Sequence, residues 1–190
     1  IATNNQGKLK DFNKILEKEG HKAISLKEAG VCVNPEETGT TFLENAYIKA
    51  KAVYDIVKKP VIADDSGLSV DALNGAPGVY SARYGGEGLT DYDRCVYLLE
   101  NIKDVPEKMR GAAFKCALCA IISDDEILNA EGEVRGTLLR ELKGENGFGY
   151  DPMFYVEEYK KTFGELSLSE KNEISHRFRA LHSLVEKLKN

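Results

Sequence analysis

Residues 111–131 have the sequence GAAFKCALCAIISDDEILNAE, in which two apolar runs flank a turn of serine and acidic residues. Apolar runs of this length, bounded by turn residues, are typical of buried β-strands. The stretch predicts strands at 111–122 and 127–131 joined by a turn at 123–126, and a further strand at 133–142 follows. Strands joined by so short a turn pair antiparallel.

Helix signals lie on both sides of these strands. The apolar spacing predicts helices at 7–19, from the capping-box sequence at 41–44 to about residue 58, and at 90–101. A short strand at 61–64 and another at 153–156 complete the pattern, together with a terminal helix. The order of elements predicts a mixed α/β protein whose strands need not all be parallel.

The composition is that of one ordinary globular domain. The chain has 190 residues, 42% hydrophobic and 30% charged, with a formal net charge of −5. Acidic charge argues against nucleic-acid binding through bulk electrostatics, so an anionic ligand would need local donors or a metal. No apolar run approaches the about 18 residues of a membrane span, and no signal-peptide pattern opens the chain. We therefore expect a cytoplasmic protein without membrane partners. Because the first residue is Ile1 rather than Met, we also expect that a short N-terminal stretch of the chain precedes it.

Cys116 and Cys119 have the spacing of many zinc and redox pairs, but the nearby sequence offers no second pair of ligands. Both lie in the apolar strand predicted at 111–122, where residues three apart point to opposite faces. We interpret the two cysteines as core residues.

A polar loop precedes the first predicted helix. Helix N-termini expose unpaired N–H groups that bind phosphate, and a lysine adds a full charge. On this segment alone an ordinary turn with a Thr or Asn cap is favoured. The candidate phosphate-binding residues are Thr3, Asn4, Asn5, Gln6, Gly7 and Lys8.

Asp64 ends the strand predicted at 61–64, and a second acid, Asp65, comes next, before Ser66 and Gly67. Carboxylates at the carboxyl end of a strand suit Mg²⁺, which takes one or two carboxylates and completes its shell with water and substrate phosphates. A self-capping Asp-Ser-Gly turn is the alternative. Glu44 is either a further carboxylate of the site or only the returning arm of its capping box.

The segment 146–152, NGFGYDP, combines glycines, two aromatics and an acid. Such a loop can stack on a flat heterocycle, and hydrophobic anchoring of the loop is an equal alternative. Farther on, one unbroken helix would spread Lys171, His176 and Arg177 around its axis. Ser175 is a plausible N-cap, so we predict a helix break there, with His176 and Arg177 in the first turn of the terminal helix.

Taken together, these segments resemble the inosine triphosphate pyrophosphatase family. The resemblance spans nearly the whole chain in the family's order, and ADDSGL followed by GAPGVYSARY, GFGYDP and ISHR is highly specific. Asn4, where many members have Gly, is a mild departure. The matching stretches are Ala2–Lys8, Thr41–Lys51, Ile62–Tyr84, Gly147–Pro152 and Glu170–Arg177.

The resemblance implies a single domain over residues 1–190 with an elongated central mixed sheet flanked by helices, two lobes around a cleft, and a homodimer. It also implies Mg²⁺-dependent hydrolysis of ITP, dITP and XTP to the monophosphate and pyrophosphate. Glu44 and Asp65 would bind the metal, and Asp65 would accept the proton, with Asp64 as support. Ser66 would contact the substrate. Lys171 and residues 3–8 would hold its triphosphate.

The base pocket implied by the resemblance consists of Phe148, Gly149, Tyr150, Asp151, His176 and Arg177. Donors aimed at a 6-oxo group would favour hypoxanthine and xanthine over adenine. Two alternatives stay open: a related nucleotide pyrophosphatase with a different base preference, and a non-catalytic nucleotide-binding regulator.

Overall fold

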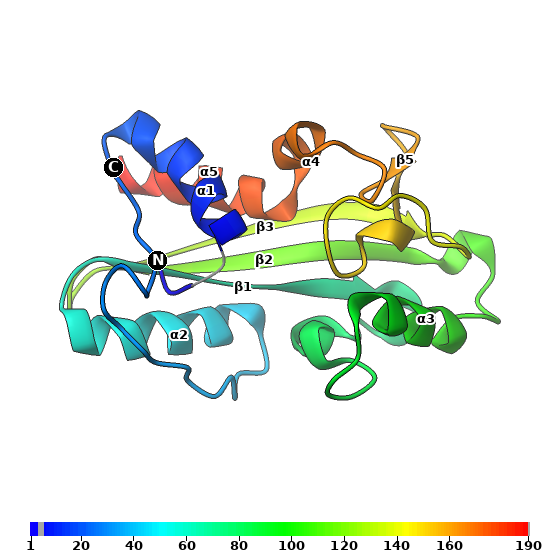
Figure 1. Cartoon of the computed structure of the whole chain (residues 1–190), viewed down its shortest axis with the longest axis horizontal. Helices are drawn as coiled ribbons and strands as arrows, with labels where there is room; N and C mark the ends of the chain where they lie inside the picture. Colours follow the sequence, from blue (N-terminus) through cyan, green and yellow to red (C-terminus); the bar gives the residue numbers. More distant parts are fainter. Residues whose placement is uncertain (4–5, 190) are drawn as a thin grey trace. The chain divides into compact units, whose positions relative to one another are not determined.

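Helices lie before, between and after the strands of the chain in the computed structural model, which describes residues 1–3 and 6–189 (Figure 1). The α-helices are α1 (Gln6–Leu16), α2 (Phe42–Val57), α3 (Asp91–Asn101), α4 (Leu168–Ile174) and α5 (His176–Leu188). The strands are β1 (Val61–Val70), β2 (Gly111–Ile121), β3 (Ile127–Leu138), β4 (Phe154–Val156) and β5 (Lys161–Thr162), and they form a sheet in that order. The pairings of β3 with β4 and of β4 with β5 are antiparallel. The predicted α/β class is confirmed.

The predicted helix starts are confirmed at the two capping boxes. The Thr41 hydroxyl accepts a hydrogen bond from the Glu44 N–H, and the Glu44 carboxylate accepts one from the Thr41 N–H. Thr90 and Asp93 make the same reciprocal pair at the start of α3. Each box satisfies N–H groups that the first helical turn leaves without a partner, which fixes the residue at which the helix begins.

Several of the predicted strand limits are wrong. The strand expected to stop at Asp64 continues to Val70, because the two acids have cationic partners and remain within β1. The strands expected at 127–131 and 133–142 are one continuous strand, β3, which passes through Gly132 and ends at Leu138.

The chain divides into two compact units. The first comprises Ile1–Ser66, Cys116–Gly132 and His176–Asn190, and the second comprises Gly67–Lys115 and Glu133–Ser175. Each unit is described by itself, and the cleft expected between two lobes stays a prediction. Within the part of the chain that the structure describes, none of the helices is both long and apolar enough to cross a membrane.

In the first unit, helices cover both faces of the sheet (Figure 1). Cys116, Leu118 and Ala120 of β2 pack with apolar residues of α1 and α5, whereas Cys119 and Ile121 pack with α2 and β1. This is the alternation expected of a strand buried on both sides. The prediction that Cys116 and Cys119 point to opposite faces of the core is confirmed.

The second unit has one core in which α3 packs with residues of all of the first four strands. Leu98 of α3 and Ile102, which follows the helix, are fully buried there. The rings of Phe114, Phe154 and Phe163 form its aromatic centre, with centroids 4.6 to 5.6 Å apart. Aromatic rings at such distances contribute beyond the apolar area that they bury.

The chain breaks its helix at Ser175, as predicted, so that α4 ends at Ile174 and α5 begins at His176. The beginning of α5 lies directly against β3. A Cβ added at Gly132 would stand 2.2 Å from the His176 carbonyl oxygen and 2.4 Å from the Ala180 nitrogen. The absence of a side chain at Gly132 therefore sets how closely α5 approaches the strand.

We predict that Gly132→Ala lowers the free energy of unfolding by about 1–3 kcal/mol, because the methyl group overlaps backbone atoms that cannot rotate away. Urea unfolding monitored by circular dichroism measures the change. Glu131→Ala, at the exposed neighbouring position of the same strand, is the control and should stay within about 0.5 kcal/mol of wild type. Equal losses in the two variants would contradict the prediction.

Candidate active site

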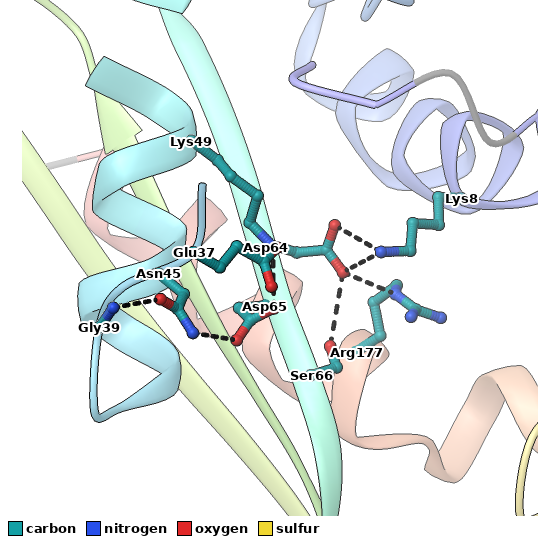
Figure 2. Close-up of polar contacts among 9 residues, drawn as sticks. All are labelled: Lys8, Glu37, Gly39, Asn45, Lys49, Asp64, Asp65, Ser66 and Arg177. Carbon is teal, nitrogen blue, oxygen red and sulfur yellow. Dashed lines mark hydrogen bonds and ion pairs between the residues drawn. The ribbon is translucent and has the colours of Figure 1, made fainter. Parts of the chain in front are cut away.

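β1 presents two consecutive carboxylates to opposite faces of the sheet. Successive side chains of a strand alternate between faces, and Asp64 and Asp65 lie within the strand rather than after it. Both are buried, with 3% and 9% of their surface exposed. Figure 2 shows a different set of partners on either side of the strand.

The Asp64 face receives cations from two helices. Lys8 of α1 donates to both Asp64 oxygens, at 3.0 and 2.9 Å. The Arg177 Nε, in the first turn of α5, lies 3.5 Å from Asp64 Oδ2. Ser66 Oγ donates to the same oxygen at 3.4 Å. Residues far apart in the sequence thus meet at one carboxylate.

These contacts decide the charge of Asp64. Burial alone would raise the pKa of the Asp64 carboxyl, but the charges of Lys8 and Arg177 outweigh burial and hold that pKa well below its usual range. Asp64 is therefore a permanent anion at neutral pH. It compensates the two cations beside it.

The Asp65 face belongs to α2 and the loop before it. Lys49 Nζ lies 2.8 Å from Asp65 Oδ1 and 2.8 Å from Glu37 Oε1, so one ammonium group is shared by two carboxylates. Asn45 Nδ2 donates to Asp65 Oδ2 at 3.4 Å, while Asn45 Oδ1 accepts from the Gly39 N–H at 2.8 Å. Burial raises the pKa of Asp65 in spite of the opposing effect of Lys49, which makes Asp65 a stronger base than an ordinary carboxylate.

A cavity of about 420 Å³ lies beside these groups in the first unit. The lysines of both faces, Lys8 and Lys49, line it together with Thr3 and Asp64. Two ammonium groups and a hydroxyl are donors suited to an anionic ligand. The other lining residues are Ala2, Leu26, Cys32, Val33, Asn34, Pro35 and Val53.

In the second unit, the loop before β4 is organised by a buried ion pair. Asp151, 2% exposed, pairs with Lys171, and its Oδ2 also accepts from the Phe148 N–H at 2.8 Å. The Phe148 ring is 59% exposed, and Lys171 Nζ lies 4.8 Å from its centroid. Tyr150 is buried, and its hydroxyl donates to the Ser81 carbonyl at 2.9 Å. Tyr150 anchors the loop, whereas Phe148 presents an open aromatic face.

This arrangement of acids, lysines and an aromatic loop can be compared with known proteins. A sequence model of the Ham1 family matches residues 1–187. The chain is a member of the Ham1 family. A relative from Bacillus subtilis named dITP/XTP pyrophosphatase is 50% identical over 99% of this chain and 95% of its own length. One from Clostridium perfringens with the same name is 47% identical over 100% of this chain and 96% of its own length.

Solved structures agree. The Ham1 protein of Staphylococcus aureus matches with a TM-score of 0.91 and 43% identity, covering 99% of this chain and 96% of that one. A nucleoside-triphosphatase, dITP/XTP pyrophosphatase, from Mycobacterium abscessus matches with a TM-score of 0.81 and 39% identity, over 98% of this chain and 96% of its own. The resemblance inferred from the sequence motifs is confirmed.

The residues that the sequence singled out in this Ham1 chain fall into both units. Lys8, Asp64, Ser66 and Arg177 meet in the first unit, and the second unit brings Phe148, Asp151 and Lys171 together. Thr3 lines the cavity, Gln6 and Gly7 open α1, and His176 opens α5, where it is 6% exposed. Gly149 adopts a φ of 59° in the loop. Asn4 and Asn5 lie outside the described residues.

Glu44 makes the contacts expected of the returning arm of a capping box. Its Oε2 accepts from the Thr40 N–H at 2.7 Å, from the Thr40 hydroxyl at 2.9 Å and from the Thr41 N–H at 3.1 Å. These bonds lower the pKa of Glu44, which keeps it ionised. The capping role is thus observed, and a metal-binding role stays a prediction.

Sequence reasoning missed Glu37, Asn45 and Lys49. A signal existed for two of them: Asn45 and Lys49 are four residues apart, so they lie on one face of α2. That face is otherwise apolar, since Ala46, Ala50 and Val53 are buried. Polar residues next to a buried stripe indicate a polar partner on the neighbouring strand.

We predict that Asp64→Asn lowers the free energy of unfolding at pH 7 by about 2–3 kcal/mol, because Lys8 and Arg177 lose their buried counter-charge. The folded-state pKa of Asp64 is lowered. Its stabilisation is therefore complete above the unfolded-state pKa of about 3.9 and is lost as pH falls toward the folded-state value. The difference between wild type and variant in urea unfolding should narrow below about pH 4.

Asp65→Asn is the matched comparison, because the pKa of Asp65 is raised rather than lowered. Its carboxylate does not favour folding at neutral pH, so the loss of stability should be smaller than for Asp64→Asn. A larger loss for Asp65→Asn would contradict this assignment of charge.

Proposed function

We propose that this chain hydrolyses the non-standard purine nucleotides ITP, dITP and XTP to the monophosphate and pyrophosphate, and so removes them from the nucleotide pool. The observation that carries the proposal is the pair of consecutive carboxylates on β1, each with its own cations, beside a cavity that two lysines line. Relatives of nearly the same length are named dITP/XTP pyrophosphatase, which supports the same activity.

We infer Mg²⁺ at Asp65, because carboxylate oxygens are ligands that Mg²⁺ prefers. Within the described ranges 1–3 and 6–189, no three His, Cys, Asp or Glu side chains cluster as a metal-binding group. Mg²⁺ needs no such group, since it takes one or two carboxylates and completes its shell with water and phosphate oxygens. Asp65 would hold the ion with Glu44 as the second carboxylate, and the bound ion would neutralise charge on the triphosphate.

Asp65 is the proton acceptor in this proposal. Its raised pKa, caused by burial, strengthens it as a base. Lys49 and Asn45 contact its two oxygens and fix the direction of the carboxylate. Asp64 stays ionised and holds Lys8 and Arg177, so Lys8 reaches the cavity in a defined position. Residues 3–8 and Lys171 would bind the triphosphate, with Lys49 as a further cation, and the charge of the triphosphate moves toward the leaving pyrophosphate.

The loop 147–151 would read the base. The exposed ring of Phe148 offers a stacking face, and Lys171 fixes the loop through Asp151. His176 and Arg177 would supply donors to a 6-oxo group, and Ser66 would contact the substrate. Adenine carries an amino group at that position and would leave the donors unpaired. We further propose that the enzyme works as a cytoplasmic homodimer that needs neither nucleic acid nor a membrane.

The proposal is tested with a panel of ITP, XTP, GTP, ATP and UTP in the presence of Mg²⁺, with identification of the products. We expect preferred hydrolysis of ITP and XTP to monophosphate and pyrophosphate. Asp65→Asn should abolish turnover while much of the nucleotide binding remains. Preference for a pyrimidine would overturn the substrate assignment, and binding of ITP without release of pyrophosphate would favour a regulator.

We predict that Lys49→Met lowers kcat by about 10²–10³-fold, because it removes a preorganised cation from the reacting centre. Steady-state kinetics with ITP measures the effect. Lys51→Met is the matched control on the same helix, since the Lys51 side chain is 45% exposed and forms its ion pair with Asp55. It should leave kcat within about 2-fold of wild type. Similar losses in both variants would remove Lys49 from the proposed site.

A further inference from the structure

The peptide groups of Gly149, in the middle of the aromatic loop, are held by two side chains of α3. The Gly149 N–H donates to Asp91 Oδ2 at 2.7 Å. The Gly149 carbonyl oxygen accepts from the Cys95 thiol at 3.3 Å. Asp91 and Cys95 are four residues apart and therefore lie on one face of the helix. One helix face thus offers an acceptor and a donor to the same loop residue.

The position of these two side chains is fixed by the helix itself. The capping box of Thr90 and Asp93 sets the first turn of α3, in which Asp91 is the first residue. Cys95 is 1% exposed and belongs to the same hydrophobic core as Leu98. Burial, with the charges of Asp91 and Asp151, raises the pKa of the Cys95 thiol to about 12, so at neutral pH it is a donor.

The same loop is held from its other side by Asp151, whose carboxylate accepts from the Phe148 N–H at 2.8 Å and pairs with Lys171. The consecutive N–H groups of Phe148 and Gly149 therefore donate to two different carboxylates, those of Asp151 and Asp91. A Cβ at Gly147 would stand 2.0 Å from Asp151 Oδ2, so the chain also passes close to that carboxylate. The backbone is fastened on both sides of an aromatic ring that is itself 59% exposed.

We propose that Asp91 is a positioning residue for recognition of the base, with Cys95 assisting it. Asp91 acts through Gly149 and does not touch the nucleotide. It holds the backbone that carries Phe148, so the ring is already oriented when a purine arrives and less conformational freedom is lost on binding. This inference rests on the proposed function, in which the loop reads the base.

The proposal predicts that a substitution of Asp91 weakens binding of the base and leaves binding of the phosphates nearly unchanged. Asp91→Ala should weaken binding of inosine monophosphate about 10-fold, whereas binding of inorganic tripolyphosphate should change by less than about 2-fold. In turnover of ITP, KM should rise about 10-fold while kcat stays within about 2-fold. Asp91→Asn keeps an acceptor oxygen for the Gly149 N–H and should recover most of the affinity.

Asp93→Ala is the matched control. It also removes an acid from the first turn of α3, and it breaks the capping box, but it leaves Asp91 opposite Gly149. Its stability should fall at least as far as that of Asp91→Ala, while its affinity for inosine monophosphate stays at the wild-type value. Calorimetry gives both affinities, and hydrogen exchange of the Phe148 and Gly149 amides should be faster only in Asp91→Ala.

The outcomes also separate this inference from the proposed function. Equal weakening of inosine monophosphate binding in Asp91→Ala and Asp93→Ala would overturn the positioning role, as would unchanged amide exchange at Gly149. If wild type releases no pyrophosphate from ITP, but inosine monophosphate binding still depends on Asp91, the proposed reaction fails and the positioning role stands.

Discussion

The alternation of side chains along β1 is the constraint on which the candidate active site depends. Asp64 and Asp65 are consecutive, so a strand must send them to opposite faces, and both are buried. A buried carboxylate is costly unless a cation or hydrogen-bond donors accompany it. Each face therefore needs its own cation: α1 and α5 supply Lys8 and Arg177, and α2 supplies Lys49. The need of each buried carboxylate for a cation thus accounts both for the helices that pack on this part of the sheet and for the charge of the site.

Sequence patterns predicted the structure well where the deciding interaction is local. The capping boxes at Thr41 and Thr90 involve residues three apart, and they mark the helix starts that the structure has. The break at Ser175 follows from the same kind of local preference. The opposite orientation of Cys116 and Cys119 follows from the period of a strand. The grouping of polar residues that the family motifs imply could not come from periodicity, and it stays a prediction.

The failures have long-range causes. Whether β1 ends at Asp64 or continues depends on cations from helices 56 residues before it and at the far end of the chain. Gly132 suggested a break in β3, but its role is the close approach of α5, which the local sequence does not reveal. Lys49 was missed because a lysine on a helix is usually solvated, and only the fold places it between Glu37 and Asp65.

Gly132 shows how far the site extends beyond the residues that carry its chemistry. It has no functional group, yet the backbone of His176 and Ala180 lies against it, and Arg177 sits between those two contacts. A side chain there would push the first turn of α5 outward and carry the guanidinium away from Asp64. Among natural variants, a change at this position would resemble a harmless strand substitution and behave like the loss of the contact between Arg177 and Asp64.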